Sequence, residues 1–269
     1  MFSLPTEPGS IGHTLDAGFK LYFVAFKKVL VLTILAAISI SLPMHAIILV
    51  MPMLVAESGA PNTGFIAALV FGYIVCMIFY MAVYLATLYR IGGIAEGRSE
   101  TLGDCLGIGF RKILPMIFAA ILYALAMMGG MMLLIVPGLI LSVSLAFFGL
   151  CIVLDGDRGL ESLRHSHRLV WGNWWRTAII GTVVFIVYYV IFVAVSVPFA
   201  VADQMIYASE IGAPPTLGQT ILSLIGDVIA TVITFPLMTS VMIAVYHDLK
   251  LRKEGQDLEA RVEALTASA

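Results

Sequence analysis

Basic and aromatic side chains gather in one polar stretch of the sequence, residues 154–177, between two long apolar segments. Arginine and tryptophan both favour the boundary between a bilayer and water. We therefore predict a helix that lies on a membrane surface and leads into a spanning helix. The stretch contains four arginines and all three tryptophans of the chain: Arg158, Arg164, Arg168, Arg176, Trp171, Trp174 and Trp175.

Four of these side chains are spaced as neighbours on one helical face. Arg164, Arg168, Trp171 and Trp175 follow one another at intervals of four, three and four residues, so a continuous helix would align them in one strip. Together with Arg176 they are the candidate residues for binding acidic lipid headgroups or phosphate, because each cation near a surface attracts anionic lipid by about 1 kcal/mol. In the alternative interpretation the arginines only fix the topology and the tryptophans only anchor the helix.

A second set of polar side chains lies inside an apolar segment, where a charged group is costly and usually functional. The set is a stripe at helical spacing around one acid: Thr220, Ser223, Asp227, Thr231 and Thr234. His45, in the first apolar segment, should lie at the same depth as Asp227, about 15 Å from the outer surface at 1.5 Å per residue. We predict that the two meet as a titratable pair. The alternative is a packing seam between helices, in which Asp227 bonds only to hydroxyl groups.

The remaining polar groups give no sign of catalysis. His165 and His167 are two residues apart, so on a helix they point to different sides and cannot share a metal ion. We interpret Asp157, in the acidic group Asp155, Asp157 and Glu161, as the N-cap of a helix that begins near Gly159. The alternative is that this acidic group forms a cation site or an acid/base site. No nucleophile elbow, phosphate loop or metalloprotease motif occurs in the sequence. We expect a protein that is not an enzyme and has neither a cofactor nor a bound metal.

Composition places the chain in the membrane. Of its 269 residues 61% are apolar and 12% charged, against about 45–50% and 25% in soluble domains. The net charge of −2 argues against nucleic acid as a partner. Three widely separated cysteines, Cys76, Cys105 and Cys151, are expected to be free thiols.

The apolar segments predict an all-α, polytopic membrane protein with six transmembrane helices and amphipathic interfacial helices. The predicted domains are an amphipathic N-terminal segment (1–28), a membrane domain (29–246) and a C-terminal tail (247–269). The third and fourth spans share residues 113–154, with their turn at Gly129-Gly130 or at Pro137-Gly138. The expected spans are 29–55, 63–89, two within 113–154, 177–202 and 217–246.

Cations predict the orientation. All 15 lysines and arginines lie within residues 1–28, 90–112, 155–176 and 247–269, and the three intervening loops have none. Under the positive-inside rule both termini are then cytoplasmic. The chain also repeats one pattern three times, from Thr14, Thr101 and Gly159: an amphipathic segment, a basic cluster, a span out and a span back. This suggests a duplicated hairpin unit, although any six-span protein with surface helices would look similar.

Two segments carry a resemblance to a known group of proteins. VPGLILSVSLAFFGLCIVLDGDRGLESLRHSHRLVWGNWWR (Val136–Arg176) and YHDLKLRKEGQDLE (Tyr246–Glu259) resemble bacterial inner-membrane proteins that include the membrane domain of some glycerophosphoryl diester phosphodiesterases and several uncharacterised six-span families. The resemblance implies a multi-pass protein of the bacterial inner membrane. It implies no activity, because only a short tail follows Leu251 and leaves no room for a hydrolase domain.

Two functions are compatible with these patterns. The first is a non-enzymatic envelope factor that contacts membrane lipids, anionic ones in particular, through its basic and aromatic surface. Such a factor could also bind a membrane-protein partner or a second copy of the chain. The second is a small transporter or channel that uses the polar stripe around Asp227. We favour the first, because surface basic and aromatic residues are abundant while buried polar groups are few.

Overall fold

The computed structural model describes residues 4–56, 63–207 and 215–267, and every element within these ranges is helical. Six helices are long and apolar enough to cross a membrane, which confirms the prediction of an all-α polytopic fold. The elements are α1 (Ile11–Ala56), α2 (Thr63–Ala95), α3 (Leu102–Leu133), α4 (Ile135–Ser144), α5 (Phe148–Leu150), the π-helix η1 (Cys151–Asp155), α6 (Leu160–Val170), α7 (Trp174–Tyr207) and α8 (Leu217–Ala267).

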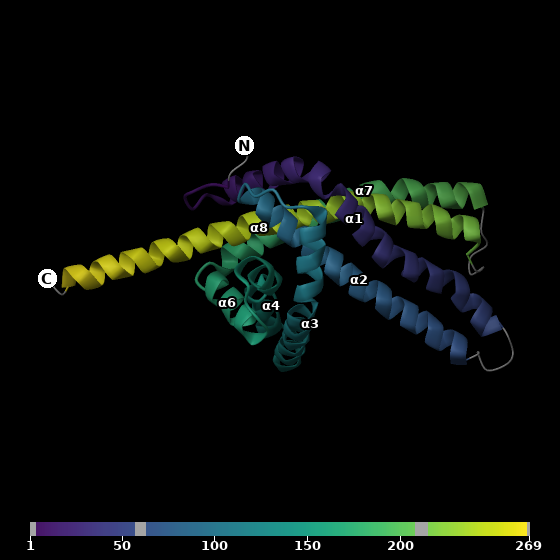
Figure 1. Ribbon diagram of the computed structural model, residues 1–269, viewed down its shortest axis with the longest axis horizontal. Coiled ribbons are helices and arrows are strands. Elements are labelled where there is room, and N and C mark those ends of the chain that lie inside the picture. Colours follow the sequence, from purple (N-terminus) through teal and green to yellow (C-terminus); the bar gives the residue numbers. More distant parts are fainter. Residues whose placement is uncertain (1–3, 57–62, 208–214, 268–269) are drawn as a thin grey trace.

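The long helices form three hairpins, α1/α2, α3/α4 and α7/α8, which leave a common base and point in different directions (Figure 1). Helices α1 and α8 pack closely against each other at this base. Gly18 permits their contact, because a Cβ at this position would lie 2.8 Å from the Cα of Val241. The hydrophobic core also sits at the base, where Leu21, Leu85, Phe147 and Ile152 are among the largest fully buried side chains.

The N-terminal segment is continuous with the first span. Helix α1 runs through 46 residues without a break, so Lys28 marks no element boundary. The side chains that pack are Leu21, Ala25 and Val29, each fully buried, whereas Phe23 is 74% exposed. Phe23 therefore points away from the packed face of α1.

The turn between the third and fourth spans lies at Leu134, between the two predicted sites. Leu134 has an extended backbone (φ −167°, ψ 149°) and joins α3 directly to α4. Helix α4 has only ten residues, about 15 Å at 1.5 Å per residue. The chain reaches Asp155 through the short α5 and the π-helix η1, so the fourth candidate span is interrupted.

The C-terminal tail is not a separate helix. Helix α8 has 51 residues, and its last part projects beyond the rest of the molecule (Figure 1). The amphipathic face predicted for the tail, with Leu258, Val262 and Leu265 on one side and the Asp257–Arg261 pair on the other, lies on side chains outside the described residues. The boundary predicted at His247 falls within one uninterrupted helix.

Candidate functional site

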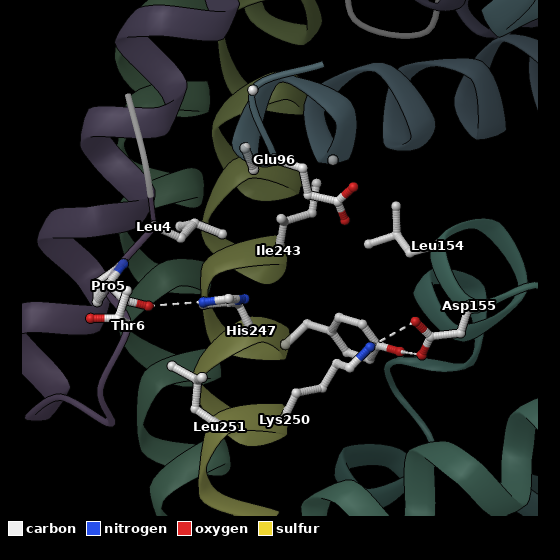
Figure 2. Close-up of a pocket in the computed structure, with 14 residues that line it drawn as sticks. Leu4, Pro5, Thr6, Glu96, Leu154, Asp155, Ile243, His247, Lys250 and Leu251 are labelled. Atoms are coloured by element: carbon white, nitrogen blue, oxygen red, sulfur yellow. Dashed lines mark hydrogen bonds and ion pairs between the residues drawn. The ribbon is translucent and has the colours of Figure 1, made fainter. Parts of the chain in front are cut away.

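Asp155 joins η1 to α8 at the base of the hairpins. Gly156, with a left-handed backbone (φ 84°), ends the π-helix directly after it. The hydroxyl of Tyr246 donates a hydrogen bond to Oδ2 of Asp155, and Nζ of Lys250 lies 2.8 Å from Oδ1. Tyr246 and Lys250 are four residues apart on α8, so both reach Asp155 from one helical face. Figure 2 shows Asp155 and Lys250 facing each other across the edge of a hollow.

Asp248 points to the opposite side of α8 and ties the N-terminal segment to α7. Its Oδ1 accepts a hydrogen bond from the backbone N–H of Gly9 at 2.9 Å, and its Oδ2 lies 3.1 Å from Nη2 of Arg176 and 2.9 Å from Nε of Arg252. Nη2 of Arg176 also donates to the carbonyl of Gly9 and to Oγ1 of Thr14, each at 2.9 Å. The prediction that Arg176 binds lipid headgroups is therefore wrong, because its guanidinium contacts a carboxylate inside the protein.

The hollow beside Asp155 has a volume of about 800 Å³ and is bounded by the N-terminal segment, the end of α2, η1 and α8. Its polar groups already have partners within the protein. Asp155, Tyr246 and Lys250 bind one another, His247 Nε2 lies 2.9 Å from the carbonyl oxygen of Pro5, and Glu96 pairs with Arg98 at 2.9 Å. Figure 2 shows the contacts of Asp155 with Lys250 and of His247 with the N-terminal segment. These contacts connect the N-terminal segment and α8 to the middle of the chain. We call the contacts of Asp155, Tyr246, Asp248 and Lys250 the joint.

The strip predicted from Arg164 to Trp175 is interrupted. Helix α6 ends at Val170, Trp171 adopts an extended backbone, and Gly172 has φ 94°, so the chain turns before α7 begins at Trp174. The prediction of one continuous helical strip is wrong, because the left-handed conformation at Gly172 breaks the helix that the strip requires.

The residues of the strip line three hollows. Arg164 and Arg168 lie at the rim of one of about 830 Å³, with His167 and Glu161. Trp171, Trp175 and Arg176 line another of about 860 Å³ against Val136 and Ile140 of α4. Trp174 is fixed beneath them, since its indole N–H donates to the carbonyl of Ile140 at 3.1 Å. Arg168 and Trp171 share a third of about 550 Å³.

We call the first of these the basic hollow. Its walls are apolar and come from three helices and one adjoining residue: Leu122 and Ala126 of α3, Leu141 of α4, Leu145 directly after α4, and Leu160 and Leu163 of α6. Arg164 and Arg168 are exposed at its rim, and neither forms an ion pair with any residue that the structure describes. The arrangement combines a cationic rim with an apolar wall.

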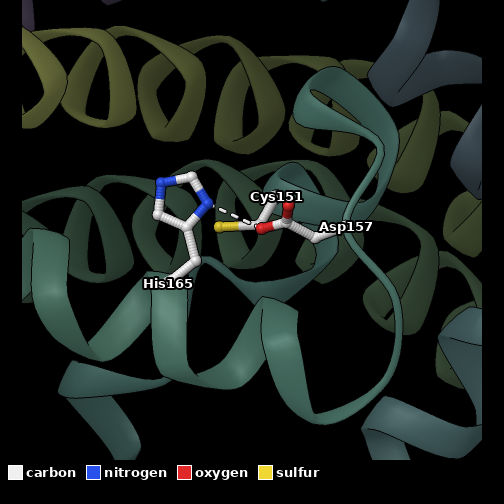
Figure 3. A group of neighbouring side chains, drawn as sticks. All are labelled: Cys151, Asp157 and His165. Carbon is white, nitrogen blue, oxygen red and sulfur yellow. Dashed lines mark hydrogen bonds and ion pairs between the residues drawn. The ribbon is translucent and has the colours of Figure 1, made fainter.

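Asp157 does not cap α6. The N-cap residue is Gly159, and no side chain caps the helix there. Oδ2 of Asp157 instead lies 2.6 Å from Nδ1 of His165 (Figure 3). The N-cap prediction is wrong because α6 folds back over the turn and brings His165 to the carboxylate. His167 points elsewhere and packs against the ring of Trp171, with 5.0 Å between centroids.

The structure brings the predicted intramembrane pair together. His45 Nε2 of α1 lies 3.5 Å from Asp227 Oδ2 of α8, and His45 Nδ1 lies 2.9 Å from the carbonyl of Ser41. Since a carbonyl only accepts, Nδ1 carries a hydrogen and Nε2 is the nitrogen that faces the acid.

The hydroxyl groups of the stripe are not arranged as a path around Asp227. Thr220 and Thr234 are buried and donate to carbonyls of their own helix, those of Thr216 and Ala230. Ser223 is exposed and Thr231 half-buried. The two ends of the stripe are therefore buried in the protein, whereas its middle lies at the molecular surface.

Sequence reasoning missed the joint formed by Asp155, Tyr246, Asp248 and Lys250. A signal for it was present, since Tyr246, Asp248 and Lys250 belong to the Tyr-x-Asp-Leu segment on which the resemblance rests. These side chains are two residues apart on α8 and so point to alternate sides of the helix. Tyr246 and Lys250 face Asp155, and Asp248 faces Arg176.

Comparison with known proteins identifies a family without identifying an activity. The sequence profile of a domain of unknown function, DUF7847, matches residues 105–249, which include all of Val136–Arg176 and the start of the Tyr-x-Asp-Leu segment. No curated protein and no solved structure matches the chain. The comparisons give no link to glycerophosphoryl diester phosphodiesterases, so that part of the resemblance stays a prediction. Because the match covers more than half of the sequence, the chain belongs to the DUF7847 family of domains of unknown function.

Proposed function

We propose that the protein is a non-enzymatic membrane protein that binds anionic phospholipid in the basic hollow. The observation that carries this proposal is the pair of exposed arginines, Arg164 and Arg168, over an apolar wall built by α3, α4 and α6. The two arginines are four residues apart on α6, so both can reach one phosphate group. The leucines below them offer the surface that an acyl chain would cover, which favours a phospholipid over free phosphate.

Three other arginines differ from Arg164 and Arg168 in that they form ion pairs, although the exposed Arg111 and Arg158 also form no ion pair with any residue that the structure describes. Arg176 and Arg252 are bound to Asp248, and Arg98 to Glu96 and Glu100. The charges of Arg98, Arg176 and Arg252 are balanced within the protein, whereas Arg164 and Arg168 have no ion-pair partner in the described part of the chain and can bind a ligand. Glu161 shares the rim of the hollow, so the net charge there is positive but small, and a singly charged lipid headgroup fits it.

Lipid retention tests the proposal. The full chain would be reconstituted in vesicles of phosphatidylglycerol and phosphatidylcholine, extracted, and examined by native mass spectrometry. At about 1 kcal/mol per cation, Arg164→Gln together with Arg168→Gln should weaken phosphatidylglycerol binding by about 2 kcal/mol, or roughly 30-fold. The matched control is Lys27→Gln with Lys28→Gln, two exposed cations of α1. Equal retention by wild type and the arginine variant, or an equal loss in the control, would reject the proposal.

We also propose an orientation and a location. The base with both chain termini faces the cytoplasm of a bacterial inner membrane. The distribution of the 15 lysines and arginines supports the orientation, and the resemblance of Val136–Arg176 and Tyr246–Glu259 to bacterial inner-membrane proteins supports the location.

A second function, a proton pathway through the membrane, is favoured by one specific observation, the contact of His45 with Asp227. Intramembrane pairs of this kind occur in the proton relays of pumps and transporters. Asp227 is the accessible partner, with 42% of its side chain exposed against 11% for His45, so protons would enter and leave through the acid.

Proton flux tests this second function. In vesicles with an imposed pH gradient, Asp227→Asn and His45→Gln should each abolish flux mediated by the wild type. The control is Ser223→Ala, an exposed position one turn away on α8, which should leave the flux unchanged. Wild-type vesicles that leak no faster than protein-free vesicles would leave the pair with a structural role only.

A further inference from the structure

We propose that Cys151, Asp157 and His165 form a binding site for a transition-metal ion, with zinc as the best fit. Their ligand atoms, a thiol sulfur, a carboxylate oxygen and an imidazole nitrogen, all lie within 4.8 Å of one another. Figure 3 shows the three side chains directed at one point between η1 and α6. This site is separate from the basic hollow and does not depend on lipid binding.

The local fold explains why these residues converge. Cys151 begins η1, a π-helix, and π-helical turns occur frequently at functional sites. Gly156 turns the chain back, and the backbone N–H of Asp157 donates to the carbonyl of Cys151 at 3.2 Å. Helix α6 then returns over this turn and carries His165 to the same place. One short segment, residues 151–165, therefore supplies all three ligands.

The donor set suits zinc. Thiolate, imidazole and carboxylate are its usual protein ligands, at about 2.0–2.3 Å. Two ligands of one tetrahedral ion then lie somewhat under about 4 Å apart, so the cluster needs only small side-chain adjustments. His165 Nδ1 and Asp157 Oδ2, now 2.6 Å apart, would move apart as the ion binds between them. The imidazole would then carry its hydrogen on Nε2, and any further proton would pass to water. The thiol proton of Cys151 would leave on binding, as metal–thiolate bonds require.

The surroundings would hold the ligands in place. The hydroxyl of Tyr246 lies 3.5 Å from the sulfur of Cys151, and Asp155 Oδ2 lies 3.7 Å from Nδ1 of His165. Both groups are themselves fixed by the joint with Lys250. Such neighbours orient metal ligands and typically change metal affinity about 10–100-fold when removed.

An ion can reach the cluster from one side. Cys151 is fully buried, but the side chain of His165 is 24% exposed and lines a hollow of about 550 Å³ beside Trp171. An ion entering through this hollow meets His165 first and the sulfur last. Binding would clamp α6, which carries the basic hollow, to η1 at the base.

Cobalt binding tests the site, because Co²⁺ bound to a thiolate gives an intense charge-transfer absorption. The full chain in detergent should bind one Co²⁺ with this band, and Zn²⁺ should displace it. Cys151→Ser should remove the band, and His165→Asn or Asp157→Asn should weaken binding by at least about tenfold. The matched controls are His167→Asn, two residues away on α6, and Cys105→Ser, another buried thiol; neither should change binding.

A second measurement needs no variant and covers the case in which a substitution prevents folding. In the wild-type chain, Zn²⁺ should slow alkylation of Cys151 and leave that of Cys76, far along the sequence, unchanged. Absence of the cobalt band together with no zinc protection of Cys151 would overturn the proposal. So would equal losses of binding in the cluster variants and in the two controls, since the ion would then bind elsewhere.

Discussion

At the scale of single residues, two aspartates at the base of the hairpins determine which segments of the chain contact each other. Asp155 and Asp248 each receive several donors from parts of the chain far apart in sequence. The sequence could not predict the partner of Arg176, since Asp248 lies 72 positions away and no local spacing connects them. His45 and Asp227 were predictable because depth along a spanning helix follows from residue counting.

We predict that Asp248→Asn destabilises the protein strongly. The side chain of Asp248 is 8% exposed and that of Arg176 is 18% exposed, so the substitution leaves a guanidinium buried without a counter-charge. Breaking such a pair typically costs about 3–5 kcal/mol. Thermal unfolding of the purified protein in detergent measures the effect.

The control for this substitution is Asp16→Asn. Asp16 pairs with Lys20 at 2.7 Å, but both side chains are more than half exposed, and exposed pairs contribute about 0–1 kcal/mol. Similar shifts in the unfolding temperature for the two variants would show that the joint around Asp248 contributes little to stability.

At the scale of elements, long apolar runs identified the spans, but element ends were harder to predict. An α-helix continues once formed unless a residue stops it, so α1 and α8 extend through the predicted interfacial segments. Gly129-Gly130 and Pro137-Gly138 were the predicted turn sites, yet Gly130 and Gly138 lie at the contact between α3 and α4. A Cβ at Gly130 would lie 3.0 Å from the Cα of Gly138, so these glycines let α3 and α4 approach each other on either side of Leu134.

Gly109 gives an element-scale prediction. A Cβ there would collide with the backbone carbonyl of Ala82, so Gly109→Ala should push α3 away from α2 and cost about 1–3 kcal/mol. Gly107, on the same helix, has no atom within 4 Å of such a Cβ. Gly107→Ala should therefore be neutral or slightly stabilising, because alanine favours helix more than glycine does. Unfolding midpoints of both variants test the packing of α2 on α3, which would be refuted if Gly109→Ala were as stable as Gly107→Ala.

At the scale of the whole molecule, the sequence predicted the class of the fold, and hydrophobicity alone is sufficient for that. It did not predict that three hairpins diverge from one base (Figure 1). The base depends on contacts of η1 and α6, which are neighbours in the sequence, with α8, which comes from a distant part of the chain. The basic hollow was missed for the same reason, because its wall and its rim belong to different helices.

The orientation proposed for the whole molecule can be tested by reporter fusions. Fusions at Glu57, near Gly138 and at Glu210 should report the outer side, and fusions at Arg98, Gly159 and Ala269 the cytoplasm, because every lysine and arginine lies in the segments assigned to the cytoplasm. Glu57, Glu210 and Ala269 lie outside the described residues. A cytoplasmic signal from Glu57 or Glu210 would contradict the six-span orientation.

The central claim is that the surface around α6 binds anionic lipid, and tryptophan fluorescence tests it most directly. All three tryptophans of the chain lie within residues 171–175, and Trp171 and Trp175 are exposed, so brominated lipid that gathers there quenches the intrinsic emission without any added label. Brominated phosphatidylglycerol should quench at a lower mole fraction than brominated phosphatidylcholine, and the difference should vanish when Arg164 and Arg168 are both replaced by Gln. Equal quenching by the two lipids in the wild-type protein would contradict the claim.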